Sequence, residues 1–116
     1  MKTNLEHVRA NVLNLEAAIK WYKSVLGFEV TGQWPPEEPN YAHFGGEGGA
    51  TFAIMEDELV PSRGRFNFTV DHVEEYWEQV KDNAVIVEEL FETDYGSKKF
   101  TIKDLDGNEL GFVQRK

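Results

Sequence analysis

Cysteine is absent from this sequence. Its absence excludes disulfide bonds, thiolate metal ligands and a cysteine nucleophile, and it is typical of proteins of the reducing cytoplasm. The sequence also lacks the long apolar run that a membrane span requires and the basic-then-apolar leader of a signal peptide. We therefore expect a cytoplasmic protein that has no membrane partner.

Basic residues are few: 12 Lys and Arg stand against 21 Asp and Glu, which gives a formal net charge of −9. An acid-rich surface repels phosphate backbones, so we expect no nucleic-acid partner. The same charge could attract a cationic small molecule, or it could serve solubility alone. Hydrophobic residues make up 41% of the 116-residue chain, which predicts one compact domain with its own core, residues 1–116.

Residues 65–70 alternate polar and apolar side chains without a break, as a strand does when only one of its faces lies in a core. Residues 7–12 have the same alternation, and an amphipathic helix pattern follows each stretch. The polar members are His7, Arg9 and Asn11 in one stretch and Arg65, Asn67 and Thr69 in the other. The sequence therefore predicts an internal repeat, in which one structural unit occurs at about residues 1–56 and again at about residues 65–116.

Each predicted unit has the order strand, helix, strand, strand, strand, so the predicted fold class is α+β with two βαβββ units. We expect Asn14 to cap the first helix and Gly27 to end it, and a capping box of Asp71 and Glu74 to begin the second helix. The expected strands cover residues 5–12, 27–31, 41–44, 51–55, 65–70, 84–88, 99–103 and 109–113. Because an amphipathic helix must cover an apolar surface, both helices should lie on the outer face, with the polar strand sides lining a concave space.

Several motifs of the sequence occur in the same order in a known group of proteins. They are His7-Val8, residues 17–22 (AAIKWY), residues 25–30 (VLGFEV) and residues 103–108 (KDLDGN). In these motifs, which extend over nearly the whole chain, the sequence resembles the vicinal oxygen chelate superfamily. That group includes glyoxalase I, bleomycin resistance proteins, extradiol dioxygenases and fosfomycin resistance enzymes. Leu105 stands where the family typically has proline.

The resemblance implies that the paired units curl into an open, curved mixed sheet around a cavity, and that the protein forms a homodimer. It also implies a shared chemistry, in which a divalent metal such as Ni, Zn, Mn or Fe is chelated by two neighbouring oxygens of a substrate. Residues of the His, Glu or Gln type in the first and last strands of the units would hold that metal. An enzyme of this kind would be a glyoxalase-like lyase or a dioxygenase.

Most of the metal-ligand positions that the resemblance implies are filled by residues that cannot bind a metal. His7 is a competent ligand, but the matching residue of the second unit is Arg65, whose guanidinium has no lone pair to give. The last-strand position, where the family usually has glutamate, falls on Gly111. The matching strand of the first unit offers only residues 51–53 (Thr, Phe, Ala). One imidazole does not hold a divalent ion specifically, so we expect no metal cofactor.

An alternative metal site remains open at this point. Glu109 could face the predicted cavity and Glu56 lies near the end of another strand, so His7, Glu56 and Glu109 could together bind one divalent ion. His7 is also the candidate catalytic residue, because an imidazole titrates near neutral pH and can act as a general base. We interpret His43 and His72 as solvated or structurally satisfied histidines.

The predicted ligand-binding residues are His7, Arg9, Asn11, Arg65, Asn67, Thr69, Glu109 and Trp34. Two arginines and a histidine suit a carboxylate, since a guanidinium can bind one through two hydrogen bonds. The same arginines could instead be paired with Glu109 or Glu29 in a structural network. An anionic ligand would also conflict with the cationic ligand that the acidic net charge favours, and the sequence leaves both alternatives open.

These observations favour a small-molecule binding protein with a degenerate, metal-free site, similar to the bleomycin resistance branch of the family. Two alternatives remain. One is a metal-dependent lyase or dioxygenase with unusual ligands, and the other is a partner-binding domain with a vestigial cavity. The sequence does not identify the ligand.

Overall fold

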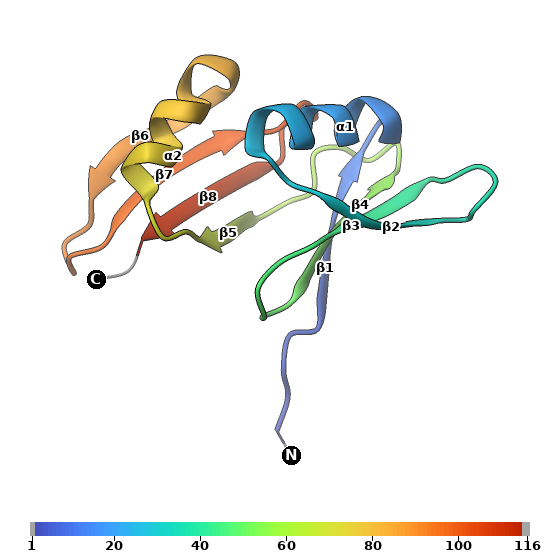
Figure 1. Cartoon of the computed structure of the whole chain (residues 1–116), viewed down its shortest axis with the longest axis horizontal. Helices are drawn as coiled ribbons and strands as arrows, with labels where there is room; N and C mark the ends of the chain where they lie inside the picture. The colour runs from blue at the N-terminus through green and yellow to red at the C-terminus, as the bar shows by residue number, and fades with distance from the viewer. Residues whose placement is uncertain (1, 115–116) are drawn as a thin grey trace. The chain divides into compact units, whose positions relative to one another are not determined.

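A computed structural model describes residues 2–114 of the chain (Figure 1). The chain divides into two units, of which the first ends at Ser62 and the second begins at Arg63. The first unit contains β1 (His7–Val12), α1 (Leu15–Trp21), a π-helical turn (Tyr22–Leu26), β2 (Val30–Trp34), β3 (Tyr41–Phe44) and β4 (Thr51–Glu56). The second contains β5 (Arg65–Thr69), α2 (Val73–Val80), a 3-10 turn (Lys81–Asn83), β6 (Val85–Glu92), β7 (Lys98–Lys103) and β8 (Glu109–Gln114). The predicted order βαβββ is confirmed in both units.

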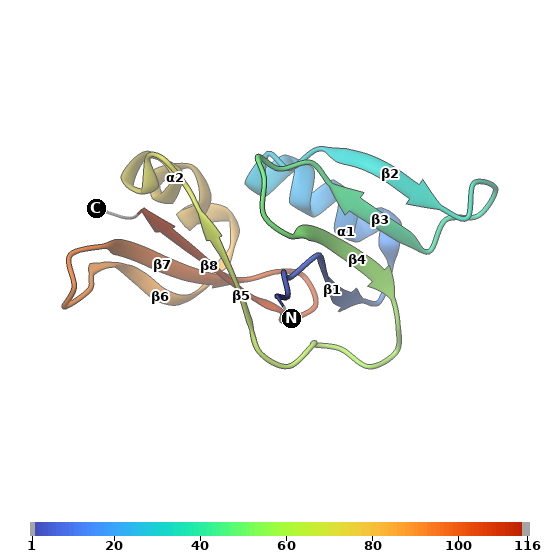
Figure 2. The same ribbon diagram turned by 90° about the horizontal axis from the view of Figure 1, so that it is seen from below.

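Each unit forms its own four-stranded mixed sheet, and the two sheets have equivalent strand orders. The order is β1-β4-β3-β2 in the first unit and β5-β8-β7-β6 in the second (Figure 2). In each sheet the first strand of the unit pairs in parallel with the last, and the remaining pairs are antiparallel. The α+β class that the repeat predicts is therefore confirmed.

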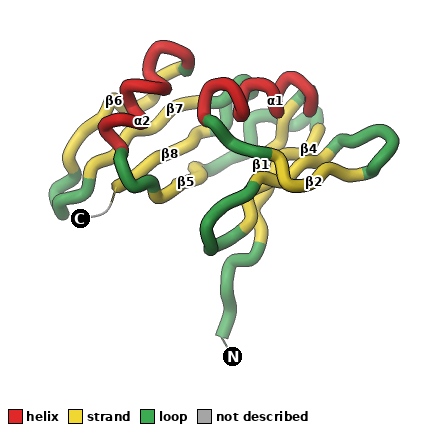
Figure 3. Tube along the Cα trace, in the orientation of Figure 1, coloured by secondary structure: helices red, strands yellow, loops and turns green. Residues whose placement is uncertain are grey.

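One helix covers one face of each sheet (Figure 3). α1 contacts β3 and β4, and α2 contacts β7 and β8. The side chains between helix and sheet are largely aromatic: the fully buried Tyr22 lies 5.2 Å from Phe44, and Phe100 lies 5.2 Å from both Trp77 and Phe112, measured between ring centroids. Because side chains alternate along a strand, the opposite face of each sheet keeps the polar residues. Within residues 2–114, no helix has the length and apolar character needed to cross a bilayer.

The first helix begins and ends where the sequence predicts. Asn14 Oδ1 accepts a hydrogen bond of 2.8 Å from the backbone N–H of Ala17, which is an N-cap interaction. Gly27 ends the helix with φ +75°, a left-handed conformation that glycine adopts without strain. The backbone N–H of Phe28 then bonds back to the carbonyl oxygen of Tyr22 at 3.2 Å. Residues 27–29 therefore connect the helix to β2, which begins at Val30, three residues later than predicted.

The predicted capping box of Asp71 and Glu74 is wrong. The residue before α2 is His72, and its side chain makes no capping hydrogen bond. The N–H of Val73 instead donates to Gln114 Oε1 at 2.9 Å. The acceptor comes from β8, so residues near the start of the helix could not indicate it.

β6 is longer than the predicted strand over residues 84–88 and runs from Val85 to Glu92. Its pairing with β7 reaches Glu92 opposite Lys98, but the register shifts twice along the way. Each shift breaks the alternation of polar and apolar residues, which is the pattern that reveals a strand in a sequence.

Asn14→Ala should lower the free energy of unfolding by about 1 kcal/mol, because the first turn of α1 loses its side-chain acceptor. Asp71→Ala is the matched control at the second helix, and it should change stability by less than about 0.5 kcal/mol because Asp71 makes no capping bond. Urea unfolding followed by circular dichroism measures both variants. Equal losses would contradict this assignment of the caps.

Candidate functional site

The register of the first sheet arranges its polar face in rows. The face carries His7, Arg9 and Asn11 of β1, and we call it the first polar face. Strand pairing puts Arg9, Ala53, His43 and Gly32 in one row and Asn11, Met55, Tyr41 and Trp34 in the next. Residues that are paired directly across neighbouring strands have side chains on the same face, so β3 contributes Tyr41 and His43 to a surface that β1 begins.

A hydrogen bond crosses this face between His7 and Tyr41. The Tyr41 hydroxyl lies 2.7 Å from His7 Nε2, and the two rings are stacked with an interplanar angle of 17°. β1 and β3 are the two neighbours of β4, so the bond passes over β4. Ala53 lies in β4 between the rows of the two residues and is 0% exposed. A small side chain at position 53 leaves room for the tyrosine ring.

His43 is held from the other side by β2. Its Nδ1 lies 2.7 Å from the Thr31 hydroxyl, and the same hydroxyl donates to the His43 carbonyl oxygen at 3.3 Å. The ring edge lies against Gly32, where a Cβ would come within 2.5 Å of His43 Nε2. Glycine at position 32 is therefore what allows the imidazole to rest on the β2 backbone.

These groups line an open pocket of about 520 Å³ at one end of the first sheet. Its lining residues are Glu6, His7, Thr31, Tyr41, His43, Phe44, Gly45, Gly46 and Thr51. The volume lies within the range of small-molecule sites, which runs from about 300 to 1,000 Å³. The walls offer aromatic surface, two imidazoles, the three hydroxyl groups of Thr31, Tyr41 and Thr51, and one carboxylate.

Other residues predicted for the ligand lie outside this pocket. Arg9 Nη1 donates to Met55 Sδ at 2.9 Å. Asn11 binds the segment that follows β4. Its side chain donates to the Leu59 carbonyl oxygen at 2.9 Å, and its backbone N–H donates to the Ser62 hydroxyl at 2.8 Å. Trp34 pairs with Tyr41 across β2 and β3, and it is 64% exposed.

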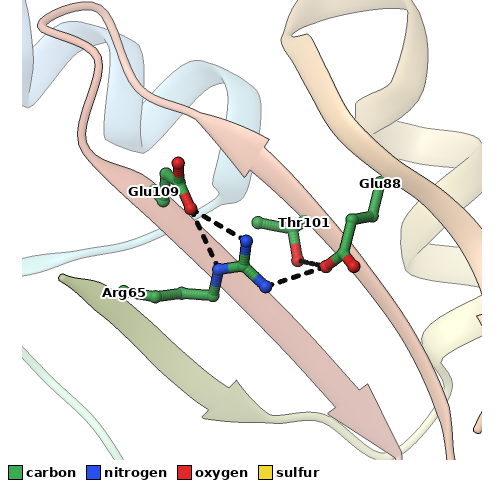
Figure 4. A network of polar contacts seen from close by, with 4 residues as sticks. All are labelled: Arg65, Glu88, Thr101 and Glu109. Carbon is green, nitrogen blue, oxygen red and sulfur yellow. Dashed lines mark hydrogen bonds and ion pairs between the residues drawn. The ribbon is translucent and has the colours of Figure 1, made fainter.

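Arg65 is the centre of an ion-pair network on the polar face of the second sheet (Figure 4). Its Nε and Nη2 donate to Glu109 Oε1 at 3.0 and 2.9 Å, and its Nη1 donates to Glu88 Oε1 at 2.9 Å. The Thr101 hydroxyl donates to the same Glu88 oxygen at 2.7 Å. Of the two alternatives that the sequence left open for Arg65, pairing with Glu109 is observed, and its second partner is Glu88 rather than Glu29.

The pKa of Glu88 is lowered from its ordinary value. The largest cause is the hydrogen bond from Thr101, burial acts next and raises the pKa, and the positive charges of Arg65 and Lys99 lower it further. Sequence reasoning missed Glu88 because β6 contains the bulges described above. The signal that could have identified it is its pairing with Thr101 across β6 and β7.

Asn67 covers the position where the resemblance implies a metal-binding glutamate. Asn67 pairs with Gly111 across β5 and β8. A Cβ at Gly111 would come within 2.1 Å of Asn67 Oδ1, so the carboxamide fills the space above the glycine. A larger residue at position 111 would have to displace it. Thr69 lies farther along the same face and is exposed.

The residues present do not fit the divalent metal that the resemblance implies. His7 Nε2 is bonded to Tyr41, the guanidinium of Arg65 is paired with carboxylates, and Gly111 has no side chain to offer. Within residues 2–114 there is no group of three or more His, Asp or Glu side chains that could hold a metal ion.

The three residues of the alternative metal set, His7, Glu56 and Glu109, each have other partners, and the described residues do not form a metal-binding group. Pairing places His7 opposite Thr51 at one end of β1 and Glu56 at the other end. Glu56 Oε2 accepts the backbone N–H of Leu15 at 2.8 Å, on the helix side of the sheet. Glu109 is bonded to Arg65. His72, interpreted as a structural histidine, lies at the start of α2.

The family of the chain follows from comparison with known sequences. Residues 4–112 match the Glyoxalase/Bleomycin resistance protein/Dioxygenase superfamily. The chain belongs to this superfamily, which is the group that the sequence motifs resemble.

Individual relatives are distant. A metallothiol transferase FosB of Staphylococcus haemolyticus is 26% identical over 120 residues, which cover 95% of this chain and 82% of that protein. The crystal structure of TnmS3, described as an antibiotic binding protein from Streptomyces sp. CB03234, has a TM-score of 0.81 at 16% identity and covers 99% of this chain and 98% of its own. The crystal structure of a lactoylglutathione lyase from Agrobacterium tumefaciens has a TM-score of 0.75 at 18% identity. The match covers 97% of this chain and 94% of that protein. At these identities the structures establish the fold alone, and the fold is shared by a binding protein and an enzyme.

Thr101→Val should raise the pKa of Glu88 toward the ordinary value of a glutamate, because it removes the largest cause of the lowered pKa. A carboxyl pKa that is lowered by folding stabilises the protein above the unfolded pKa, and the stabilisation is lost as the pH falls through the folded pKa. The variant should therefore be less stable than the wild type near pH 7 and approach it below about pH 4. Carboxyl-detected NMR titration measures the pKa directly.

Thr69→Val is the control for this titration, because Thr69 lies on the same exposed face and should leave the pKa of Glu88 unchanged. An unchanged pKa in Thr101→Val would show that the Thr101 hydroxyl does not act on Glu88.

Proposed function

We propose that this protein binds a small organic molecule without a metal ion, in the pocket beside His7 and Tyr41. The observation that carries the proposal is the hydrogen bond between these two residues. At the position where the resemblance implies a metal ligand, the imidazole is joined to a phenol in the wall of a 520 Å³ pocket. This bond supports a role for the imidazole in an organic binding surface.

The charges around the two polar faces support a ligand that is neutral or weakly ionised. Arg65 is neutralised by Glu88 and Glu109, so it is not an open receptor for an anion. Glu6 is the carboxylate in the lining of the pocket, and a carboxylate there disfavours an anionic ligand. Because its charge is neutralised, Arg65 is only a weak argument against a cationic ligand.

The superfamily and its structural relatives agree with a binding role. TnmS3, with the same fold, is named as an antibiotic binding protein. A homodimer and a cytoplasmic location stay predictions from the sequence and its resemblance. Sedimentation at micromolar concentration would test the dimer.

A second candidate is a metal-dependent thiol transferase, which the 26% identity to a metallothiol transferase FosB favours. We place it second, because Arg65 and Gly111 stand at two of the ligand positions that the family resemblance implies. A metal-dependent activity would have to use ligands that the described residues do not bring together.

A thermal-shift screen of small neutral and cationic organic molecules tests the first proposal. At a ligand concentration about 100 times the Kd, binding should stabilise the protein by about 2.7 kcal/mol. The shift should be the same with and without EDTA, and it should decrease in Tyr41→Phe, which lacks the hydroxyl that bonds His7. Trp34→Ala is the control, because this exposed residue is not part of the pocket lining.

Two outcomes would contradict the proposal. A shift that EDTA abolishes and a divalent metal restores would favour the transferase. A shift that is equal in the wild type and in Tyr41→Phe would place the binding site elsewhere.

A further inference from the structure

The two histidines of the pocket have different hydrogen-bond states. His7 uses Nε2 in its bond with the Tyr41 hydroxyl. His43 uses Nδ1 in its bond with the Thr31 hydroxyl. Among the interactions of residues 2–114, His43 Nε2 has no hydrogen-bond partner. His43 Nε2 is therefore the ring nitrogen of this residue without a hydrogen bond among the described residues, and it lies beside Gly32 in β2.

The bonds of Thr31 bear on where the hydrogen of a neutral His43 lies. A threonine hydroxyl has one hydrogen to donate and lone pairs to accept with. When that hydrogen goes to the His43 carbonyl oxygen at 3.3 Å, the 2.7 Å bond to the ring is donated by Nδ1–H. When it goes to Nδ1 instead, the ring hydrogen lies on Nε2. The first arrangement leaves Nε2 with a lone pair, as an acceptor.

The surroundings of His43 favour a flat ligand that donates a hydrogen bond. The rings of Tyr41 and His43 lie at 6.0 Å between centroids with an interplanar angle of 67°, and both residues line the pocket. Ring surfaces of this kind suit an aromatic guest. The Glu6 carboxylate, in the same lining, is acceptor-only when ionised. An acceptor nitrogen and a carboxylate in the same lining favour a guest with an O–H or N–H group over one with an anionic group.

We propose that His43 Nε2 is the hydrogen-bond acceptor for the ligand, and that the ligand is an aromatic molecule with a neutral O–H or N–H donor, as in a phenol. This inference rests on the proposed binding function and specifies it. Thr31 acts as a positioning residue because it selects the tautomer, and Gly32 allows the ring to lie against β2. The sequence alone favours a structural or solvated role for His43.

Nitrogen-15 NMR at pH 8 tests the tautomer without any ligand. The expected result is a protonated Nδ1 and an unprotonated Nε2 in the wild type and in Thr31→Ser, which keeps the hydroxyl. Thr31→Val, which has nearly the same shape, should lose this preference. A predominant Nε2–H tautomer in the wild type would overturn the proposal.

The ligand class is tested with 2-naphthol and 2-methoxynaphthalene, two probes of similar shape of which only the first can donate a hydrogen bond. 2-Naphthol should shift the resonances of His43 and Tyr41 and bind about tenfold more tightly than its methyl ether, the ratio expected for one hydrogen bond of about 1.4 kcal/mol. Thr31→Val should reduce this ratio, and Thr31→Ser should keep it.

The outcomes separate this inference from the broader function. Equal binding of both probes in the pocket would overturn the role of Nε2 and leave the binding function standing. No shift of the pocket resonances with either probe would overturn the ligand class, while the thermal-shift screen would still decide whether the protein binds another small molecule.

Discussion

The parallel pairing of the first strand with the last strand of each unit is the constraint on which the rest depends. It places β1 beside β4 and β5 beside β8, so the polar side chains of each first strand share a face with their partners. The alternation along the first strands then separates the two faces of a sheet. Apolar residues such as Ala10 and Val12 are buried, and the polar residues of the same strand are left on the other face.

Equivalent sheets in the two units carry different chemistry on equivalent faces. In the first unit the first strand begins with His7, whose bond with Tyr41 passes over a small residue and forms the wall of a pocket. In the second unit the first strand begins with Arg65, which is neutralised by two glutamates. The two units therefore share a scaffold, while residues on the polar face of one line a pocket and the polar face of the other carries an ionic network. This division explains how an arginine can lie on a polar face without making that face a receptor for anions.

The sequence predicts what depends on neighbouring residues, and it fails where a partner comes from a distant strand. The alternation of β1 and β5, the cap at Asn14 and the end at Gly27 are local patterns, and the structure contains them. The start of α2 depends on Gln114, which is far away in the sequence. The place of His43 in the pocket lining likewise depends on a distant strand, because it requires the register of β3 on β4, although the alternate burial of Ala42 and Phe44 follows a simple pattern.

Metal stoichiometry tests the central claim, which is that this member of the superfamily binds its ligand without a metal. Elemental analysis of tag-free protein, dialysed in turn against nickel, zinc, manganese and iron(II), measures it. The ligand set described here predicts much less than one equivalent per chain for each metal. Near one equivalent of any of them, lost in His7→Ala, would show that His7 is a metal ligand in solution and would contradict the account.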